Sequence, residues 1–128
     1  MPSPDELRGA VEDYIEAMST NDRDRYVSLF AADATLEDPV GSEVRRGHDA
    51  IGEFWDMVHT LSDTITLVPT GPVRVAGTEL AFPMQAVSDV GGAEMVVDII
   101  DVFAFDEEGK IAAMRAFWDP SEMRPREA

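Results

Sequence analysis

The feature that most constrains the fold of this chain is a change of hydrophobic period near residue 64. Before that point apolar residues recur every three or four positions, and after it they alternate with polar residues. Helices followed by a run of strands predict an α+β domain, with three helices packed on one face of a curved, mostly antiparallel sheet. The length of 128 residues fits a single domain over 1–128.

Three helices are expected in the first half. The first begins after Ser3, with a proline at its first position and acids in its first turn, and ends near Ser19. A short second helix, capped by Asn21 or Asp22, is expected to run to Phe30. The apolar stripe of the third helix consists of Ile51, Phe54, Trp55, Val58 and Leu61.

Turn signals rich in Gly and Pro separate the predicted strands, and they close hairpins between successive strands. Pro83 falls inside one strand, which indicates an edge or a bulge and therefore a curved sheet. The strands are expected at about 34–38, 64–68, 72–76, 79–88, 93–105 and 110–118.

Composition and charge exclude several classes of function. Cysteine is absent, which removes thiolate nucleophiles and cysteine-based metal sites, and the only two histidines, His48 and His59, are expected on the solvated surface. No metal is therefore expected. The net charge of −16 disfavours nucleic acid, membranes and anionic substrates, so a neutral substrate is expected.

The chain also lacks the sequence motifs of several common active sites and of targeting segments. It has no phosphate-binding loop, dinucleotide fingerprint or nucleophile elbow, so any catalysis has to use carboxylates and hydroxyls. The N-terminal residues contain no apolar signal segment, and no apolar run approaches the about 20 residues of a membrane span. A cytoplasmic protein is therefore expected.

Asp101 is the most unusual polar residue of the predicted strands. Alternation over 97–105 places it on one face with Val97, Ile99 and Phe103. Burial raises the pKa of a carboxyl because the charged form loses its water, so a neutral Asp101 with a proton to donate is one interpretation. The other is a structural acid bonded to a nearby backbone or hydroxyl group.

Two further polar residues point toward the same interior. Asp38 shares a face with Leu36, although an Asp before a proline is also a common turn former. Tyr14 lies on the apolar stripe of the first helix, where its ring is either simple core or the carrier of a buried hydroxyl. Together with Asp101, these residues predict a phenol and two carboxyl groups around one apolar cavity.

Four short stretches, in order over nearly the whole chain, carry a family pattern: YIE at 14–16, LFAADATLEDPVGS at 29–42, DIIDV at 98–102 and MRAFW at 114–118. They resemble the bacterial steroid Δ-isomerases (ketosteroid isomerases). The FAxDAT pattern alone is typical of the wider NTF2-like superfamily, which includes SnoaL-like proteins, polyketide cyclases and non-enzymes. EDPVG combined with the helix tyrosine and the strand aspartate is more specific.

The resemblance implies a mechanism without cofactor or metal. Asp38 would be the general base, and Tyr14 with protonated Asp101 would form the oxyanion hole for a neutral 3-oxo-Δ5-steroid. These enzymes are themselves the known example of an aspartic acid kept neutral to donate a hydrogen bond, so that assignment follows the family. The family fold is a cone of three helices and a curved sheet, usually assembled as a homodimer.

The resemblance also implies apolar residues around the steroid, each of which is equally consistent with ordinary core. One of them departs from the family, because Trp55 stands where members usually carry a tyrosine that supports the hydroxyl network. We expect Trp55 to act chiefly as an apolar wall, since its indole can donate but not accept. The enclosing residues are Phe54, Trp55, Phe82, Met84, Phe103, Met114 and Trp118.

Two other functions remain open at this stage. Another NTF2-like enzyme, such as a polyketide cyclase, would use the same cavity with Asp38 as an acid or base. A non-catalytic module would use it only to bind small hydrophobic ligands. The outer face of the sheet supplies one further expectation: Ile100 and Val102 lie opposite Asp101, so a homodimer is expected to cover that apolar face.

Overall fold

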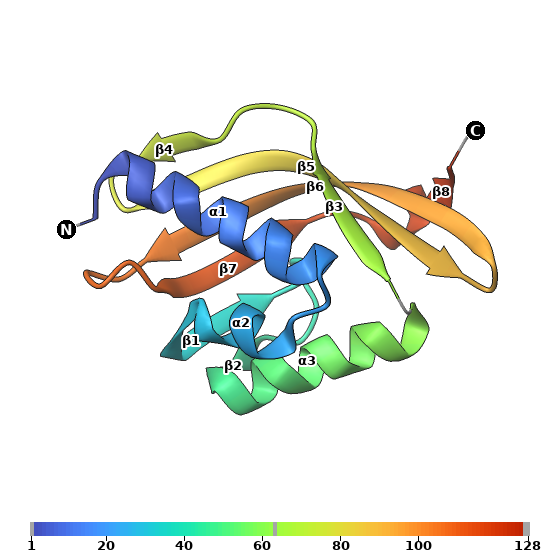
Figure 1. Ribbon diagram of the computed structural model, residues 1–128, viewed down its shortest axis with the longest axis horizontal. Helices are drawn as coiled ribbons and strands as arrows, with labels where there is room; N and C mark the ends of the chain where they lie inside the picture. Colours follow the sequence, from blue (N-terminus) through green and yellow to red (C-terminus); the bar gives the residue numbers. More distant parts are fainter. Residues whose placement is uncertain (1, 63, 127–128) are drawn as a thin grey trace.

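The computed structural model describes residues 2–62 and 64–126. Three helices, α1 (Pro4–Ser19), α2 (Arg23–Ser28) and α3 (Gly47–Leu61), lie on one face of a curved sheet (Figure 1). α1 packs against β3 and α3 packs against β1. The strands are β1 (Phe30–Glu37), β2 (Arg45–Arg46), β3 (Ile65–Pro69), β4 (Arg74–Ala76), β5 (Glu79–Val90), β6 (Ala93–Phe105), β7 (Ile111–Phe117) and β8 (Arg124–Pro125).

The sheet has the order β2-β1-β7-β6-β5-β3, with β4 paired to β5 and β8 paired to β6. Among the described residues, every strand pair is antiparallel except β1 with β7, which run parallel. The predicted α+β class, with a mostly antiparallel sheet covered by helices on one face, is confirmed. A short 3₁₀ helix at Pro120–Glu122 follows β7 and precedes β8.

The starts of α1 and α2 follow from capping residues. The Ser3 hydroxyl accepts from the Glu6 N–H at 3.2 Å, and the Ser3 N–H donates back to the Glu6 carboxylate at 3.3 Å, which completes a capping box. Asp22, rather than Asn21, caps α2 by accepting from the Arg25 N–H at 3.1 Å. Both helices therefore begin where local side chains satisfy the free backbone donors.

Three predictions about local structure are wrong. α2 ends at Ser28 and β1 already begins at Phe30, because Phe30 pairs with Ile111 of β7, a partner far away in sequence. The segment before α3, expected as a loop, includes the two-residue strand β2 paired with the end of β1. Leu61, expected on the buried stripe of α3, is 70% exposed because it is the helix's last residue.

Pro83 lies in the middle of β5, between the part of this strand that pairs with β3 and the part that pairs with β4. β3 pairs with residues 84–88 of β5 and β4 pairs with 79–81, so no ladder needs an N–H from Pro83 on that side. The Pro83 carbonyl accepts from the Thr70 N–H at 3.1 Å as the chain crosses from β3 to β4. Gly71 permits this crossing, because a Cβ there would lie 2.9 Å from the Pro83 ring. The predicted edge-like position of Pro83 is confirmed.

The core forms between the helices and the concave face of the sheet. Alternation along β6 is as predicted: Ile99, Asp101 and Phe103 are buried, whereas Ile100 on the opposite face is 51% exposed. β6 is paired along its length with β5, and its second half also pairs with β7, so Asp101 lies in the interior of the sheet. Among the described residues, no helix is long and apolar enough to cross a membrane.

Candidate active site

Asp101 is the most deeply buried polar residue of the site. It lies between Phe82 of β5 and Ala116 of β7, its exposed fraction is 0%, and neither carboxyl oxygen has a hydrogen-bond partner among the described residues. Burial raises the pKa of Asp101 well above its ordinary value, and the negative charge of Asp38 raises it further. This environment favours the neutral form of the carboxyl, which has a proton to donate.

Asp38 follows directly after β1, in a loop that is tied to β7. The Val40 N–H donates to the Ala116 carbonyl at 2.8 Å. Glu37, the last residue of β1, accepts from Arg115 Nε at 3.2 Å. These bonds fix the backbone on either side of Asp38, so the position of its carboxylate is set by the β1–β7 pairing.

The Asp38 carboxylate has one strong donor, which the sequence did not predict. Trp118 Nε1 donates to Asp38 Oδ1 at 2.6 Å. Burial raises the pKa of Asp38, and the Trp118 hydrogen bond opposes that rise by stabilising the charged form. Trp118, expected only as an apolar wall, therefore also orients the carboxylate through its indole N–H.

Tyr14 projects from the middle of α1 onto the inner face of β6. Its exposed fraction is 2%, and its ring meets that of Phe103 edge to face at 5.3 Å. Burial raises the pKa of Tyr14 well above 10, and negative charge on Asp101, Tyr26 and Asp38 adds to the shift. The predicted phenol and two carboxyl groups thus act on one another in a water-poor interior, whereas the apolar cavity expected around them stays a prediction.

Tyr26, on α2, joins the same group and had no predicted role in the site. It is 1% exposed, and the charges of Asp38 and Asp101 both add to the rise that burial causes in its pKa. Its helical spacing next to Val27 and Leu29 gave only a signal for core. The only signal in the sequence was that Tyr26 and Tyr14 are the chain's two tyrosines.

The residues expected to enclose a substrate all belong to the core or pack against it. Phe54 and Trp118 are half-buried, and Arg45 lies over the Phe54 ring at 5.5 Å. Trp55 contacts the ring of Tyr26 at 4.8 Å and stacks on His59 at 4.1 Å. The fully buried members are Trp55, Phe82, Met84, Phe103 and Met114.

His59 corrects the expectation that both histidines are simply solvated. His48 is exposed, with Nε2 2.8 Å from the Phe30 carbonyl. His59 Nδ1 lies 2.8 Å from the Trp55 carbonyl, which places the proton on Nδ1, and its Nε2 is buried without a partner among the described residues. The stacking on Trp55 draws the His59 ring inward.

The surface hollows lie away from these groups. The larger, of about 600 Å³, is lined mostly by polar residues that include Asp33, His48 and Asp106, and Lys110 donates from its rim to the Ser28 carbonyl at 3.0 Å. Neither this hollow nor a second one of about 320 Å³ is lined by Tyr14, Asp38 or Asp101. Within residues 2–62 and 64–126, no three His, Asp or Glu side chains converge as a metal site would require.

The comparison with known proteins agrees with this architecture. Residues 11–114 match the model of the SnoaL-like domain family. This chain belongs to the SnoaL-like family. The matched residues include Tyr14, Tyr26, Asp38 and Asp101, and the match confirms the predicted NTF2-like resemblance.

Individual relatives of this SnoaL-like domain fall into two groups. A Steroid Delta-isomerase from Nocardioides simplex is 38% identical over 118 residues, which is 92% of this chain and 94% of that protein. Epoxide hydrolase LasB from Streptomyces lasalocidi is 25% identical over 95% of this chain, and the chain spans 51% of its length. A solved structure of the epoxide hydrolase/cyclase-like enzyme SalBIII has a TM-score of 0.89 at 28% identity, covering 98% of this chain and all of that one.

Proposed function

We propose that this SnoaL-like domain is a steroid Δ-isomerase, which converts 3-oxo-Δ5-steroids into 3-oxo-Δ4-steroids by moving one proton from C4 to C6. Asp38 removes the C4 proton, which is acidic because it lies between a carbonyl and a double bond. The product of this step is a dienolate and a protonated Asp38. The same proton then returns to C6, so no net proton is consumed and neither cofactor nor metal takes part.

The donors opposite the base make this step possible. An aspartate is a weak base for a carbon acid, so the negative charge that forms on the steroid oxygen has to be stabilised as it develops. Tyr14 and neutral Asp101 both carry a proton for that oxygen. Preorganised donors in a dry interior cost no rearrangement at the moment of reaction.

One observation carries the proposal: Asp101 is 0% exposed, has no partner among the described residues, and lies beside the buried Tyr14 in a chain that is 38% identical to a Steroid Delta-isomerase. An unpartnered buried carboxyl costs folding stability, about 1–3 kcal/mol. Such a cost is expected where the group has a task in the reaction, and donation to a substrate oxygen is the task that fits an acid without other bonds.

An absorbance assay tests the function directly. 5-Androstene-3,17-dione is mixed with the protein at pH 7, and the conjugated enone of the product is followed in the ultraviolet. We expect enzyme-dependent formation of the conjugated product. When C4 is labelled with deuterium, part of that deuterium is expected at C6 of the product. Absence of turnover across several 3-oxo-Δ5-steroids would reject the isomerase.

A second candidate is acid–base opening of an epoxide, which the names of LasB and SalBIII bring forward. The observation that favours it is the same pair of environments, since ring opening also needs an acid for the oxygen and a base for a nucleophile. A neutral aliphatic epoxide assayed for diol or cyclic ether separates the two functions. A protein that binds steroid with neither activity would instead be a ligand-binding module.

We also propose that a second copy of the chain covers the convex face of the sheet. Ile100 is 51% and Phe117 is 42% exposed, and the two residues pair across β6 and β7 on that face. Arg115 lies over the Phe117 ring at 5.2 Å. Light scattering at micromolar concentration is expected to give twice 14.0 kDa. Ile100→Asp is expected to give the monomer, and a wild-type monomer would contradict the proposal.

A further inference from the structure

Tyr26 is a buried titratable group that the proposed mechanism leaves unused. It is one of two tyrosines in the chain, and the other is Tyr14. Its side chain is 1% exposed and supplies the buried contact of α2. A phenylalanine would fill nearly the same volume without burying a polar group, so the hydroxyl needs an explanation of its own.

The ring of Tyr26 lies in the same aromatic cluster as Tyr14. Its centroid is 5.7 Å from that of Tyr14, 4.8 Å from that of Trp55 and 5.3 Å from that of Phe30. Trp55 in turn stacks on His59 at 4.1 Å. Tyr26 is therefore the ring through which Trp55 reaches Tyr14, and it occupies the place beside the site phenol.

Both carboxyl groups of the site also contribute to the electrostatic environment of Tyr26. Burial, then the charge of Asp38, then that of Asp101 raise the pKa of Tyr26, so it stays protonated. Across residues 2–62 and 64–126, no hydrogen bond to another protein group contributes to the pKa shift of either tyrosine. Two phenol protons are thus available in one small region that also contains both carboxyl groups.

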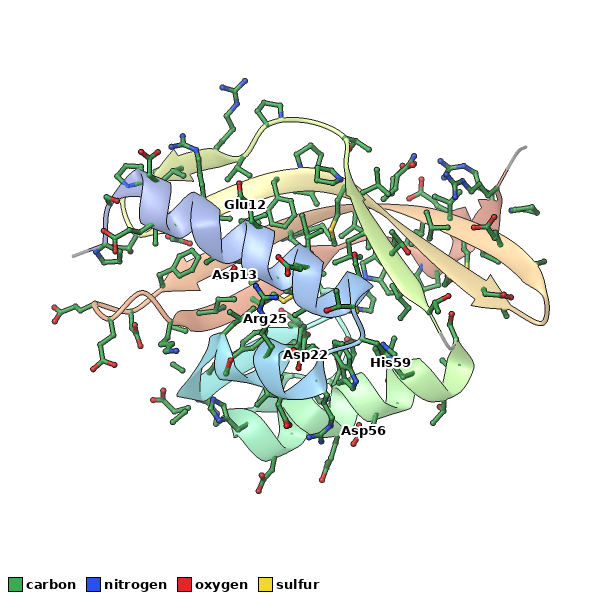
Figure 2. All side chains as sticks on the ribbon, in the orientation of Figure 1. Glu12, Asp13, Asp22, Arg25, Asp56 and His59 are labelled. Carbon is green, nitrogen blue, oxygen red and sulfur yellow. The ribbon has the colours of Figure 1, made fainter. Side chains whose placement is uncertain are left out.

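Ion pairs on the outer side of α2 hold this short helix in place. Arg23 forms a bidentate pair with Asp56 of α3, at 2.8 and 3.1 Å, and Arg25 pairs with Asp13 of α1 at 2.9 Å. Figure 2 shows Asp13, Arg25 and Asp56 on these three neighbouring helices. Exposed pairs contribute little stability each, but a set that links α2 to both neighbours restrains its rotation and hence the direction of Tyr26.

We propose that Tyr26 is a positioning residue for Tyr14: in the substrate complex its hydroxyl donates a hydrogen bond to the Tyr14 oxygen, directly or across one water, while Tyr14 donates to the substrate oxygen. This inference deepens the proposed isomerase function and rests on it. As Tyr14 gives its proton toward the developing oxyanion, its own oxygen gains negative charge. A second phenol donor stabilises that charge and so strengthens the first bond.

The test removes one oxygen atom and keeps the ring. We expect Tyr26→Phe to lower kcat about tenfold with KM changed less than about twofold, because the lost bond matters only when charge develops on Tyr14. In a Tyr14→Phe background, Tyr26→Phe is expected to lower kcat by less than about twofold, since Tyr26 then has no phenol to support.

Ligand affinity provides a second readout that needs no turnover. Substituted phenols, whose phenolates resemble the dienolate oxygen, are expected to bind Tyr26→Phe about tenfold more weakly than wild type. A neutral steroid without a 3-oxo group is expected to bind both proteins equally. If the wild type does not isomerise steroids, the proposed function fails and the phenol comparison alone decides the role of Tyr26.

Phe30→Leu is the matched control, because it loosens the packing around the Tyr26 ring and leaves both hydroxyls. Its effect on kcat is expected to be the same with and without Tyr14→Phe. The role of Tyr26 is rejected if Tyr26→Phe behaves like this control, or if its kcat stays within about twofold of wild type and its phenol affinity is unchanged.

Discussion

Asp38 and Asp101 are two carboxyl groups in one interior, and they differ in what surrounds them. Asp38 lies in a loop at the end of β1, is half-buried, and accepts a 2.6 Å hydrogen bond from Trp118. Asp101 lies inside the sheet on β6, is fully buried, and has no partner among the described residues. The two carboxyl groups are thus in opposite environments. A hydrogen-bond donor stabilises the charge of Asp38, and no donor among the described residues stabilises a charge on Asp101.

That difference predicts opposite chemical roles. A donor stabilises the carboxylate form of Asp38 and limits how far burial raises its pKa, which suits a base. Asp101 has no such donor, and the charge of Asp38 raises its pKa further, which suits an acid. The charged form of Asp38 thus favours the proton on Asp101.

The largest expected effect comes from removing the base. Asp38→Asn keeps the shape and the Trp118 contact but cannot accept the C4 proton. We expect kcat to fall by about 10³-fold or more, with steroid affinity nearly unchanged, because general bases contribute about 10²–10⁴-fold and the environment of Asp101 favours its neutral form. Steady-state kinetics and equilibrium binding of the product measure the two quantities.

Asp33→Asn is the control for that change, since Asp33 is an exposed carboxylate on the same strand, β1. Its kcat is expected to stay within about twofold of wild type, as for most exposed substitutions. Near wild-type turnover in Asp38→Asn would remove Asp38 from the role of base.

Asp101 should show the second largest effect, and the replacement should matter. Asp101→Leu removes the donor and is expected to lower kcat about 10²–10³-fold, whereas Asp101→Asn keeps an N–H donor and is expected to cost only about tenfold. Infrared difference spectra between wild type and Asp101→Asn, with product bound at pH 7, should contain a protonated carboxyl band. A carboxylate band from Asp101 would contradict its assignment as the acid.

Stability measurements show whether the lower kcat of Asp101→Leu comes from lost catalysis or from lost folding stability. Both oxygens of Asp101 lack partners among the described residues, so an apolar side chain of similar size relieves an unfavourable burial. We expect Asp101→Leu to unfold at higher denaturant concentration, with a gain of about 1–3 kcal/mol. A variant that is more stable and less active separates the function of the carboxyl from its folding cost.

Trp118→Phe tests the donor that distinguishes Asp38. The hydrogen bond lowers the pKa of Asp38, so its loss should raise that pKa further above the ordinary range. A base works only when deprotonated, and activity is lost as pH falls through its pKa. The acid limb of kcat/KM is therefore expected to move to higher pH in Trp118→Phe, with less than about tenfold loss on the alkaline side. An unmoved limb would show that the indole does not support the charge.

The positions of Asp101 and Tyr14 could be predicted from the sequence, because they depend on local pattern. Alternation placed Asp101 among Ile99 and Phe103, and helical spacing placed Tyr14 on the inner face of α1, since both periods are fixed by backbone geometry. Capping residues gave the start of α1 for the same reason. Each of these positions is determined by neighbours within a few residues.

Interactions between distant segments could not be predicted in this way. The Trp118 bond to Asp38 joins residues 80 positions apart, and the early start of β1 depends on its parallel pairing with β7. Tyr26 looked like ordinary core because its spacing on α2 says nothing of Tyr14. His59 was misplaced because the inward turn of its ring depends on stacking on Trp55.

Trp55 should give the smallest effect, because its aromatic ring pairs among the described residues are with Tyr26 and His59 and not with Tyr14. Its indole packs on Tyr26 and His59, so it acts on Tyr14 only through the Tyr26 ring. Trp55→Phe keeps an aromatic ring against Tyr26 and is expected to change kcat by less than about tenfold, a loss below about 1.4 kcal/mol of transition-state stabilisation. Trp55→Ala is expected to do more damage, since the indole is 5% exposed and its removal leaves a cavity next to Tyr26. Kinetics at equal folded fraction, checked by denaturant unfolding, separates the two. A hundredfold loss of kcat in Trp55→Phe at unchanged stability would mean that the indole N–H itself belongs to the donor network. The comparison of Asp38 with Asp101 would then have to include the hydrogen bond that Trp55 donates.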